Sequence, residues 1–457
     1  MKKERNYKIS MFLVACTILF SATLLNNRII YPDSYGYISN HITRGAGYPL
    51  FLDFFEKVFG NSYLDYVIIF QTLFLAFSIC YFCLTLRKEL KLSKAISFLF
   101  AIVIIIINIA PALFSNSGIL MYKAICTEGL TYPLSLIFFI LVIKAVFKNS
   151  LKKLNYTLPL IFLMTLIRFQ TVFTLVIYII VYIYILLTNN IIKRSIIYLP
   201  ILVLTLLFSS TLFEKSYNYF INDNFVSTPF GTTSFSIKVM YISEKKDSEY
   251  ITNNISKQIF IETMEKASAK GMLQETFKND TIENNLIEMY KHYENSYDIL
   301  FYRIFDEKCR EILKTNGPKY DILRDKVASD IIHDLLPLHL DDYVRLTFTS
   351  GIIGLVRSNS MFFSYGFFAQ NLLYFVSVVA YILSFIFMLR AFKKQNKSKT
   401  GLMMVIAYLM ILGNASPSIL VHFPISRYTF LAMPMFYISL FTLVYFEIVE
   451  YIKKLNY

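Results

Sequence analysis

Long apolar runs separated by short polar segments dominate the hydrophobic pattern of this chain. A helix needs about 20 predominantly apolar residues to cross the hydrocarbon core of a bilayer. The apolar runs lie near residues 8–26, 64–86, 95–114, 129–147, 155–168, 170–189, 195–213, 367–390, 401–420 and 428–450. The pattern therefore predicts an all-α polytopic membrane protein with about ten transmembrane helices.

The fifth and sixth runs are short and meet at Arg168, so they form either two helices or one long helix. Basic clusters at residues 148–153 and 193–194 flank the pair, and both clusters favour the cytoplasmic side. An even number of crossings between them satisfies this rule. We therefore expect a tight hairpin at Arg168 and place both termini in the cytoplasm.

This topology predicts three parts of the chain. Residues 1–213 form an N-terminal transmembrane module, 214–366 an extracytoplasmic loop domain, and 367–457 the C-terminal transmembrane helices. The loop domain carries charges of both signs and helical patterns, which predicts mainly α structure. Its last part, 343–368, is amphipathic and is expected to be a juxtamembrane helix.

Composition supports the membrane class. Of 457 residues, 56% are hydrophobic and 17% charged, whereas about 25% are charged in an average soluble domain. The first apolar run lacks a small-residue cleavage site, so Met11 to Leu25 is expected to be a retained helix. With no Trp and 34 Tyr, tyrosine is expected to supply the interfacial aromatic belt. The richness in Lys, Asn, Ile, Tyr and Phe suggests an AT-rich bacterial genome and hence a bacterial plasma (inner) membrane.

The net charge of +14 follows the same topology. Its cations gather in short clusters that alternate with the apolar runs, which is the positive-inside pattern, so their expected partner is anionic lipid. No nucleic-acid partner is expected.

One histidine pattern and one cysteine pair are candidate signs of metal binding or of a disulfide. His333 and His339 are six residues apart with Pro337 between them, which does not place them on one helical face. Cys126 and Cys309 both fall in predicted outer segments, and a disulfide between them is left open. The chain has no phosphate-binding glycine loop and no nucleophile elbow, so a cytosolic nucleotide-driven enzyme is not supported.

Two acids are candidates for catalysis at the outer surface. Asp33 follows the first helix, where a carboxylate can act as general base towards a hydroxyl; alternatively, the Pro32-Asp33-Ser34 stretch simply caps an interfacial helix. Glu128 begins the fourth apolar run, where the helix dipole alone accounts for an acid. The topology places both acids on the same face, so we interpret them as a candidate catalytic pair.

Several cations are predicted at the same face. Arg168 lies at the turn of an apolar hairpin and Arg427 precedes the last run; an ionisable group between membrane spans indicates function, and the planar guanidinium suits phosphate. Lys123, Arg44, Arg345 and Arg357 are further outer cations. The alternative for each is snorkelling to lipid headgroups.

These motifs together resemble the GT-C superfamily of polytopic glycosyltransferases. The resemblance rests on DSYGYI after the first helix, RGAGYPLFL before the second, TEGL at Glu128, Arg168 after the fifth, and Arg427-Tyr428 with Pro434 near the last. Within the superfamily the chain looks most similar to bacterial relatives of dolichyl-phosphate-mannose protein mannosyltransferases and of the lipid A aminoarabinose transferase. Ala46 and Phe169 stand where that family often has proline. The similarity covers roughly 1–213 and 367–450.

The resemblance implies an inverting transfer of a sugar from a polyprenyl-phosphate donor to a hydroxyl of a glycan or lipid acceptor. Asp33 would be the general base, with Glu128 assisting, and Arg168, Arg427 and Lys123 would hold the donor phosphate. Further substrate-binding residues are expected at Tyr35, Arg44, Tyr48, His422 and Tyr428. No cofactor is required, although a divalent cation held with Glu128 stays open.

Two other classes of protein fit parts of the pattern. An O-antigen polymerase or ligase also acts on polyprenyl-linked glycans, but it needs no acid directly after the first helix. A transporter or flippase of lipid-linked glycans is expected to carry ionisable residues at mid-membrane, whereas the acids here lie at the predicted outer surface.

Overall fold

The computed structural model describes residues 2–25, 30–114, 120–190, 196–277, 286–357, 367–394, 398–422 and 430–455. Helices make up 87% of the structure, and no strand occurs within these ranges. The predicted all-α class is confirmed.

Eight of the ten expected spans coincide with described helical segments long and apolar enough to cross a membrane. The helices that form them are α1 (Lys2–Leu24), α4 (Tyr63–Leu90), α6 (Glu128–Phe147), α9 (Phe173–Thr188), α11 (Tyr198–Asn222), α18 (Phe367–Lys393), α19 (Ser398–Val421) and α21 (Met433–Leu455). The chain is therefore a multi-pass membrane protein.

The remaining two expected spans are α5 (Lys94–Phe114) and α8 (Leu158–Ile167). With 10 residues, α8 is about 15 Å long, which is half the thickness of the hydrocarbon core. It ends at Arg168, whose extended backbone leads through η3 (Phe169–Val172) into α9. The expected hairpin at Arg168 is thus present, but its first arm is too short to cross a bilayer alone.

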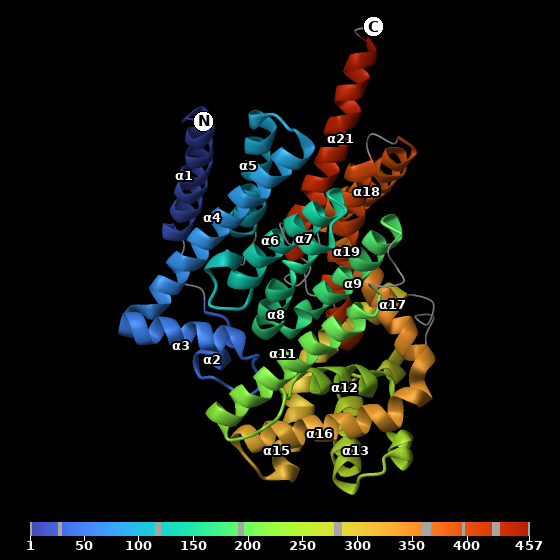
Figure 1. Cartoon of the computed structure of the whole chain (residues 1–457). Coiled ribbons are helices and arrows are strands. Elements are labelled where there is room, and N and C mark those ends of the chain that lie inside the picture. The colour runs from blue at the N-terminus through green and yellow to red at the C-terminus, as the bar shows by residue number, and fades with distance from the viewer. Residues whose placement is uncertain are drawn as a thin grey trace.

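Both termini lie at one end of the helix bundle, beside the connection between α4 and α5 (Figure 1). The opposite end carries two short helices of the first connecting segment, α2 (Pro32–Ile38) and α3 (Gly47–Phe59). In α3, the buried residues Tyr48, Leu52 and Phe55 follow helical spacing, so this helix packs one face against α4 and α8. Which side of a membrane each end occupies stays a prediction.

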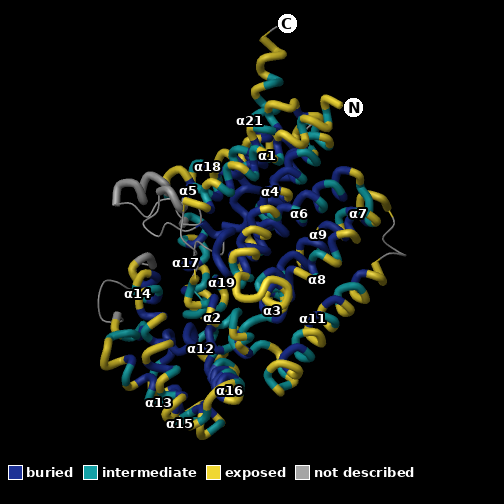
Figure 2. The backbone as a smooth tube through the Cα atoms, turned by 90° about the vertical axis from the view of Figure 1, so that its left-hand side faces the viewer, coloured by how far each residue is buried: buried dark blue, intermediate teal, exposed yellow. Residues whose placement is uncertain are grey.

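Residues 231–277 and 286–357 form a second helical group at the α2–α3 end of the bundle (Figure 1). Its helices are α12 (Gly231–Ile242), α13 (Asn254–Ala269), α14 (Leu286–Asp298), the π-helical η7 (Ile299–Phe305), α15 (Asp306–Leu313), α16 (Gly317–Leu335) and α17 (Leu340–Arg357). This group buries a hydrophobic core of its own, separate from that of the bundle. Dark blue, buried backbone is visible in both groups in Figure 2.

Helix α11 leads from the bundle to the segment before the second helical group. Helix α11 continues beyond the apolar run to Asn222, where Asp223 in the left-handed conformation (φ 55°) ends it. In this extension, the Tyr217 hydroxyl donates to Asn40 Oδ1 (2.9 Å). The extra turns therefore attach α11 to the first connecting segment. Helices α12 and α17 also pack against α19.

Candidate active site

Asp33 lies in the first turn of α2 and forms an ion pair with Arg44. Its Oδ1 is 3.0 Å from Arg44 Nη2, with the two side chains 31% and 20% exposed. The N-terminus of α2 is held by Ser34, whose Oγ accepts from the Tyr31 N–H (2.9 Å). The interpretation of this stretch as a helix cap therefore fits Ser34, and Asp33 is oriented by an arginine.

Glu128 and Arg168, which we expected in separate roles, pair with one another. Glu128 begins α6, and its Oε1 is 2.6 Å from Arg168 Nη1; their side chains are 2% and 12% exposed. Arg168 Nε also donates to Gln170 Oε1 (3.0 Å), and Gln170 in turn donates to the Asn414 carbonyl in α19 (2.6 Å). The pair thus joins α6, the α8–α9 turn and α19.

Tyr37 lies beside the Asp33–Arg44 pair. Its ring is 5.2 Å from the Arg44 guanidinium carbon and packs edge-to-face on Tyr48 at 5.2 Å between centroids. Burial raises the pKa of its hydroxyl to about 12, and the charges of Arg44, Glu128, Arg168 and Asp33 all act on it. The structure therefore brings Asp33, Glu128 and Arg168 to one neighbourhood.

Two glycines of the first connecting segment make this neighbourhood possible. A Cβ on Gly36 would lie 2.7 Å from Arg44 Nε, and a Cβ on Gly47 would lie 2.7 Å from the backbone of Leu166 and Ile167. Such distances are too short for carbon contacts. Gly47 thus lets α3 approach the end of α8, directly before Arg168.

Tyr48 and Lys123 are buried and have partners within the protein. The Tyr48 hydroxyl donates to Gln71 Oε1 (2.9 Å), and Gln71 Nε2 donates to the Tyr122 carbonyl (2.9 Å). Lys123 Nζ donates to the Thr23 carbonyl at the end of α1 (2.6 Å). In this conformation both side chains therefore brace the segment before α6; their expected contacts with substrate and donor phosphate stay predictions.

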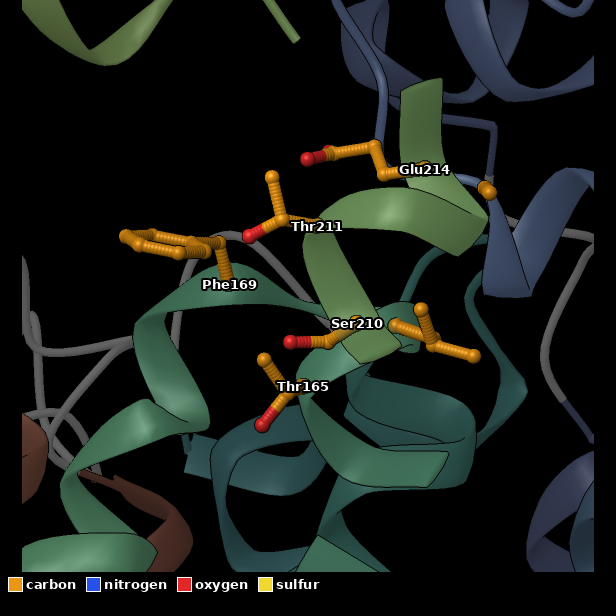
Figure 3. A pocket seen from close by; sticks show the side chains of 7 residues that line it. Thr165, Phe169, Ser210, Thr211 and Glu214 are labelled. Atoms are coloured by element: carbon orange, nitrogen blue, oxygen red, sulfur yellow. The ribbon is translucent and has the colours of Figure 1, made fainter. Parts of the chain in front are cut away.

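A small cavity of about 20 Å³ lies beside the Arg168 turn. Figure 3 shows Thr165 and Phe169 on one side of it and Ser210, Thr211 and Glu214 of α11 on the other. This volume holds about one water molecule. The sequence analysis missed the residues of α11 because they lie at the end of an apolar run, although Glu214 directly after that run was a usable signal.

The other expected site residues are more scattered. Tyr35 is 67% exposed, and His422 at the end of α19 packs its ring 3.8 Å from that of Tyr297. Arg345 is exposed on α17. Arg427 and Tyr428 lie outside the described residues, as does the side chain of Arg357.

Two histidines of the second helical group pair with aspartates of the same group. His339 Nε2 lies 2.7 Å from Asp247 Oδ2 and His333 Nδ1 lies 2.9 Å from Asp334 Oδ1. No group of three or more His, Cys, Asp or Glu side chains that could hold a metal occurs among the described residues. Cys126 and Cys309 form no disulfide.

Comparison of the chain with protein-family models, curated proteins and solved structures gives no match.

Proposed function

We propose that the protein is a glycosyltransferase that moves a sugar from a polyprenyl-phosphate donor to a hydroxyl of a cell-surface glycan or lipid. The reaction takes place at the end of the bundle that carries α2 and α3, which we assign to the outer face of a bacterial plasma membrane. The excess of lysine and arginine near the termini supports this orientation. The proposal places the protein in the GT-C class.

One observation carries the proposal: the connecting segment that holds the Asp33–Arg44 pair packs, at Gly47, against the end of α8 directly before Arg168, which pairs with the buried Glu128. A partly exposed carboxylate, here Asp33, and an arginine held in place by a partner, here Arg168, are the two elements that an inverting transfer from a phosphate leaving group requires. Both come from segments far apart in the sequence, so their proximity is a property of the fold.

In this mechanism Asp33 accepts the proton of the acceptor hydroxyl as its oxygen attacks the anomeric carbon of the donor. The bond between that carbon and the phosphate oxygen breaks, and polyprenyl phosphate leaves with the electron pair. Arg168 stabilises the charge that grows on the phosphate, and Glu128 holds Arg168 in place. The cavity at α11 is too small for a sugar, so we expect the outer ends of α8 and α11 to separate when substrate binds.

The test is transfer by native membranes that contain either the wild-type protein or Asp33→Asn. Membranes are incubated with a panel of polyprenyl-phosphate sugars, and released polyprenyl phosphate and labelled glycan are both measured. Loss of a general base costs about 10²- to 10⁴-fold, so we expect Asp33→Asn to lose at least a hundredfold in rate at unchanged protein level. Asp65→Asn, an exposed acid in the first turn of α4, is the control and should keep its rate within about twofold.

Two results would contradict the proposal. Full activity of Asp33→Asn would leave the general base without a role. Movement of labelled lipid-linked glycan across sealed vesicles, with no release of polyprenyl phosphate, would assign the protein to the flippases instead.

A further inference from the structure

A cavity of about 570 Å³ lies at the opposite end of the bundle, near both termini. Helices α1, α4 and α6 and the turn after α4 form its walls, close to the N-terminus in Figure 1. Among the residues that line it are two acids, Glu4 and Glu89, and four lysines, Lys8, Lys88, Lys91 and Lys144. None of them belongs to the candidate active site.

The charges of this cavity are unbalanced. Its two acids are already paired, Glu4 with Arg87 (2.7 Å) and Glu89 with Lys148 (3.3 Å). The four lining lysines, Lys8, Lys88, Lys91 and Lys144, have no carboxylate within 4.0 Å in the described part of the chain. The four lysines without a carboxylate partner therefore give the cavity an excess of positive charge, which attracts anions.

The walls below these lysines are apolar and partly exposed. On α4, Tyr81, Leu84 and Lys88 lie on one helical face because they are three and four residues apart. Helix α6 is buried on all sides except at Ile137, Leu141 and Lys144, which also share a face. Both faces thus carry a lysine at the end of the bundle and apolar side chains towards its middle.

We propose that this cavity binds the headgroup of an anionic phospholipid, with the phosphodiester between Lys88, Lys91 and Lys144 and an acyl chain along the apolar faces of α4 and α6. A soluble phosphate satisfies the lysines alone, whereas a lipid satisfies both the lysines and the apolar walls. The headgroup bridges α1, α4 and α6, so it stabilises their packing at this end. The proposal does not depend on the glycosyltransferase activity.

The test is lipid binding by purified protein, measured by native mass spectrometry after titration with phosphatidylglycerol or phosphatidylcholine. We expect the wild-type protein to retain phosphatidylglycerol preferentially and to gain thermal stability from it. A lysine near a membrane surface contributes roughly fivefold in affinity for anionic lipid, so Lys88→Gln/Lys91→Gln/Lys144→Gln should bind about a hundredfold more weakly. Lys152→Gln/Lys153→Gln, which removes two lysines of the short α7 (Leu151–Asn155) outside the cavity, is the control and should bind as the wild type does.

Other outcomes overturn the proposal. Equal retention of both lipids, or equal loss in the control variant, would mean that the cavity has no specific role. Equal stabilisation by inorganic phosphate would assign it to a free anion. If the triple variant does not fold, the single variant Lys144→Gln must still weaken phosphatidylglycerol binding about fivefold, and a variant that binds normally would refute the site.

Discussion

At the α2–α3 end of the bundle, Asp33 and Glu128 each have an arginine within 3.0 Å. At the end with both termini, the four lysines of the large cavity have no carboxylate that close among the described residues. Paired charges hold each other in one geometry, which suits a site that must position reacting groups. Unmatched cations attract an anion from outside, which suits a site that recruits a ligand.

The charged side chains of the two ends also differ in how deeply they are buried. The side chains of Glu128 and Arg168 are 2% and 12% exposed, so removal of either charge leaves the other desolvated. Of the lysines of the cavity, Lys8, Lys88 and Lys91 are exposed and Lys144 is partly exposed, so removal of one leaves no buried charge without its partner. The same substitution of a charged residue is therefore expected to cost far more stability at the α2–α3 end.

The largest effect is expected from Glu128→Ala. It leaves Arg168 buried without its carboxylate, and breaking a buried pair costs about 3 kcal/mol or more. The measurement is the free energy of unfolding in mixed micelles, with Lys88→Ala as the comparison at the other end. That exposed lysine should change stability by less than about 0.5 kcal/mol.

A double-mutant cycle separates the interaction energy between Glu128 and Arg168 from the other losses in stability that each substitution causes. Glu128→Gln and Arg168→Gln should each destabilise, and the double variant should lose at least about 1 kcal/mol less than their sum. Simple additivity of the two losses would show that the two side chains are not coupled, and the contrast between the ends would then rest on burial alone.

Gly47→Ala is expected to have an intermediate effect. Its Cβ would meet the backbone of Leu166 and Ile167 at 2.7 Å, and backbone cannot move aside as a flexible side chain does. Overpacking of this kind costs about 2 kcal/mol and shifts Arg168 relative to the connecting segment that carries Asp33, so transfer activity should fall more than stability. Unfolding and activity are measured on the same preparation.

Gly401→Ala is the matched substitution at the end with the termini. There the nearest atoms belong to the Phe392 ring, at 3.2 Å or more, and a ring can shift by a few tenths of an ångström. We expect activity to be unchanged and stability to change by less than about 1 kcal/mol. Equal losses in both variants would mean that the close approach at Gly47 has no special importance for the site.

The sequence predicts the helices of the bundle well because each apolar run is long enough to mark a span by itself. It also predicts the turn at Arg168, since basic clusters on both sides constrain the number of crossings. It does not predict that α8 has only ten residues, because a short apolar helix and a span share the same composition.

The sequence does not predict the contacts between segments that are far apart along the chain. The topology places Glu128 and Arg168 on one face, but forty residues separate them and no periodicity relates them, so their pairing follows only from packing of α6 against α8. Helix α3 is a different case. The spacing of Tyr48, Leu52 and Phe55 indicates an amphipathic helix, so the sequence carried a signal for α3 although no helix was predicted there.

The smallest expected effect concerns Lys238 of α12, which lies at the α2–α3 end, where Asp33 and Glu128 have arginine partners. Lys238 itself has no carboxylate within 4.0 Å in the described residues. It is fully buried, donates to the Ile419 carbonyl at the end of α19 (2.6 Å), and lies 5.2 Å from the Tyr343 ring. Burial lowers the pKa of its amine to about 7 from 10.5.

A base with a lowered pKa in the folded state binds fewer protons there than in the unfolded chain, so the free energy of unfolding should rise with pH between about 7 and 10. Lys238→Met removes this group, and the slope of its melting temperature against pH should be smaller than that of the wild type over this range. The difference between the two slopes isolates Lys238 from tyrosines that titrate in both proteins. Identical slopes would mean that the amine stays protonated, so that a buried charged lysine would lie at this end with no carboxylate within 4.0 Å in the described residues.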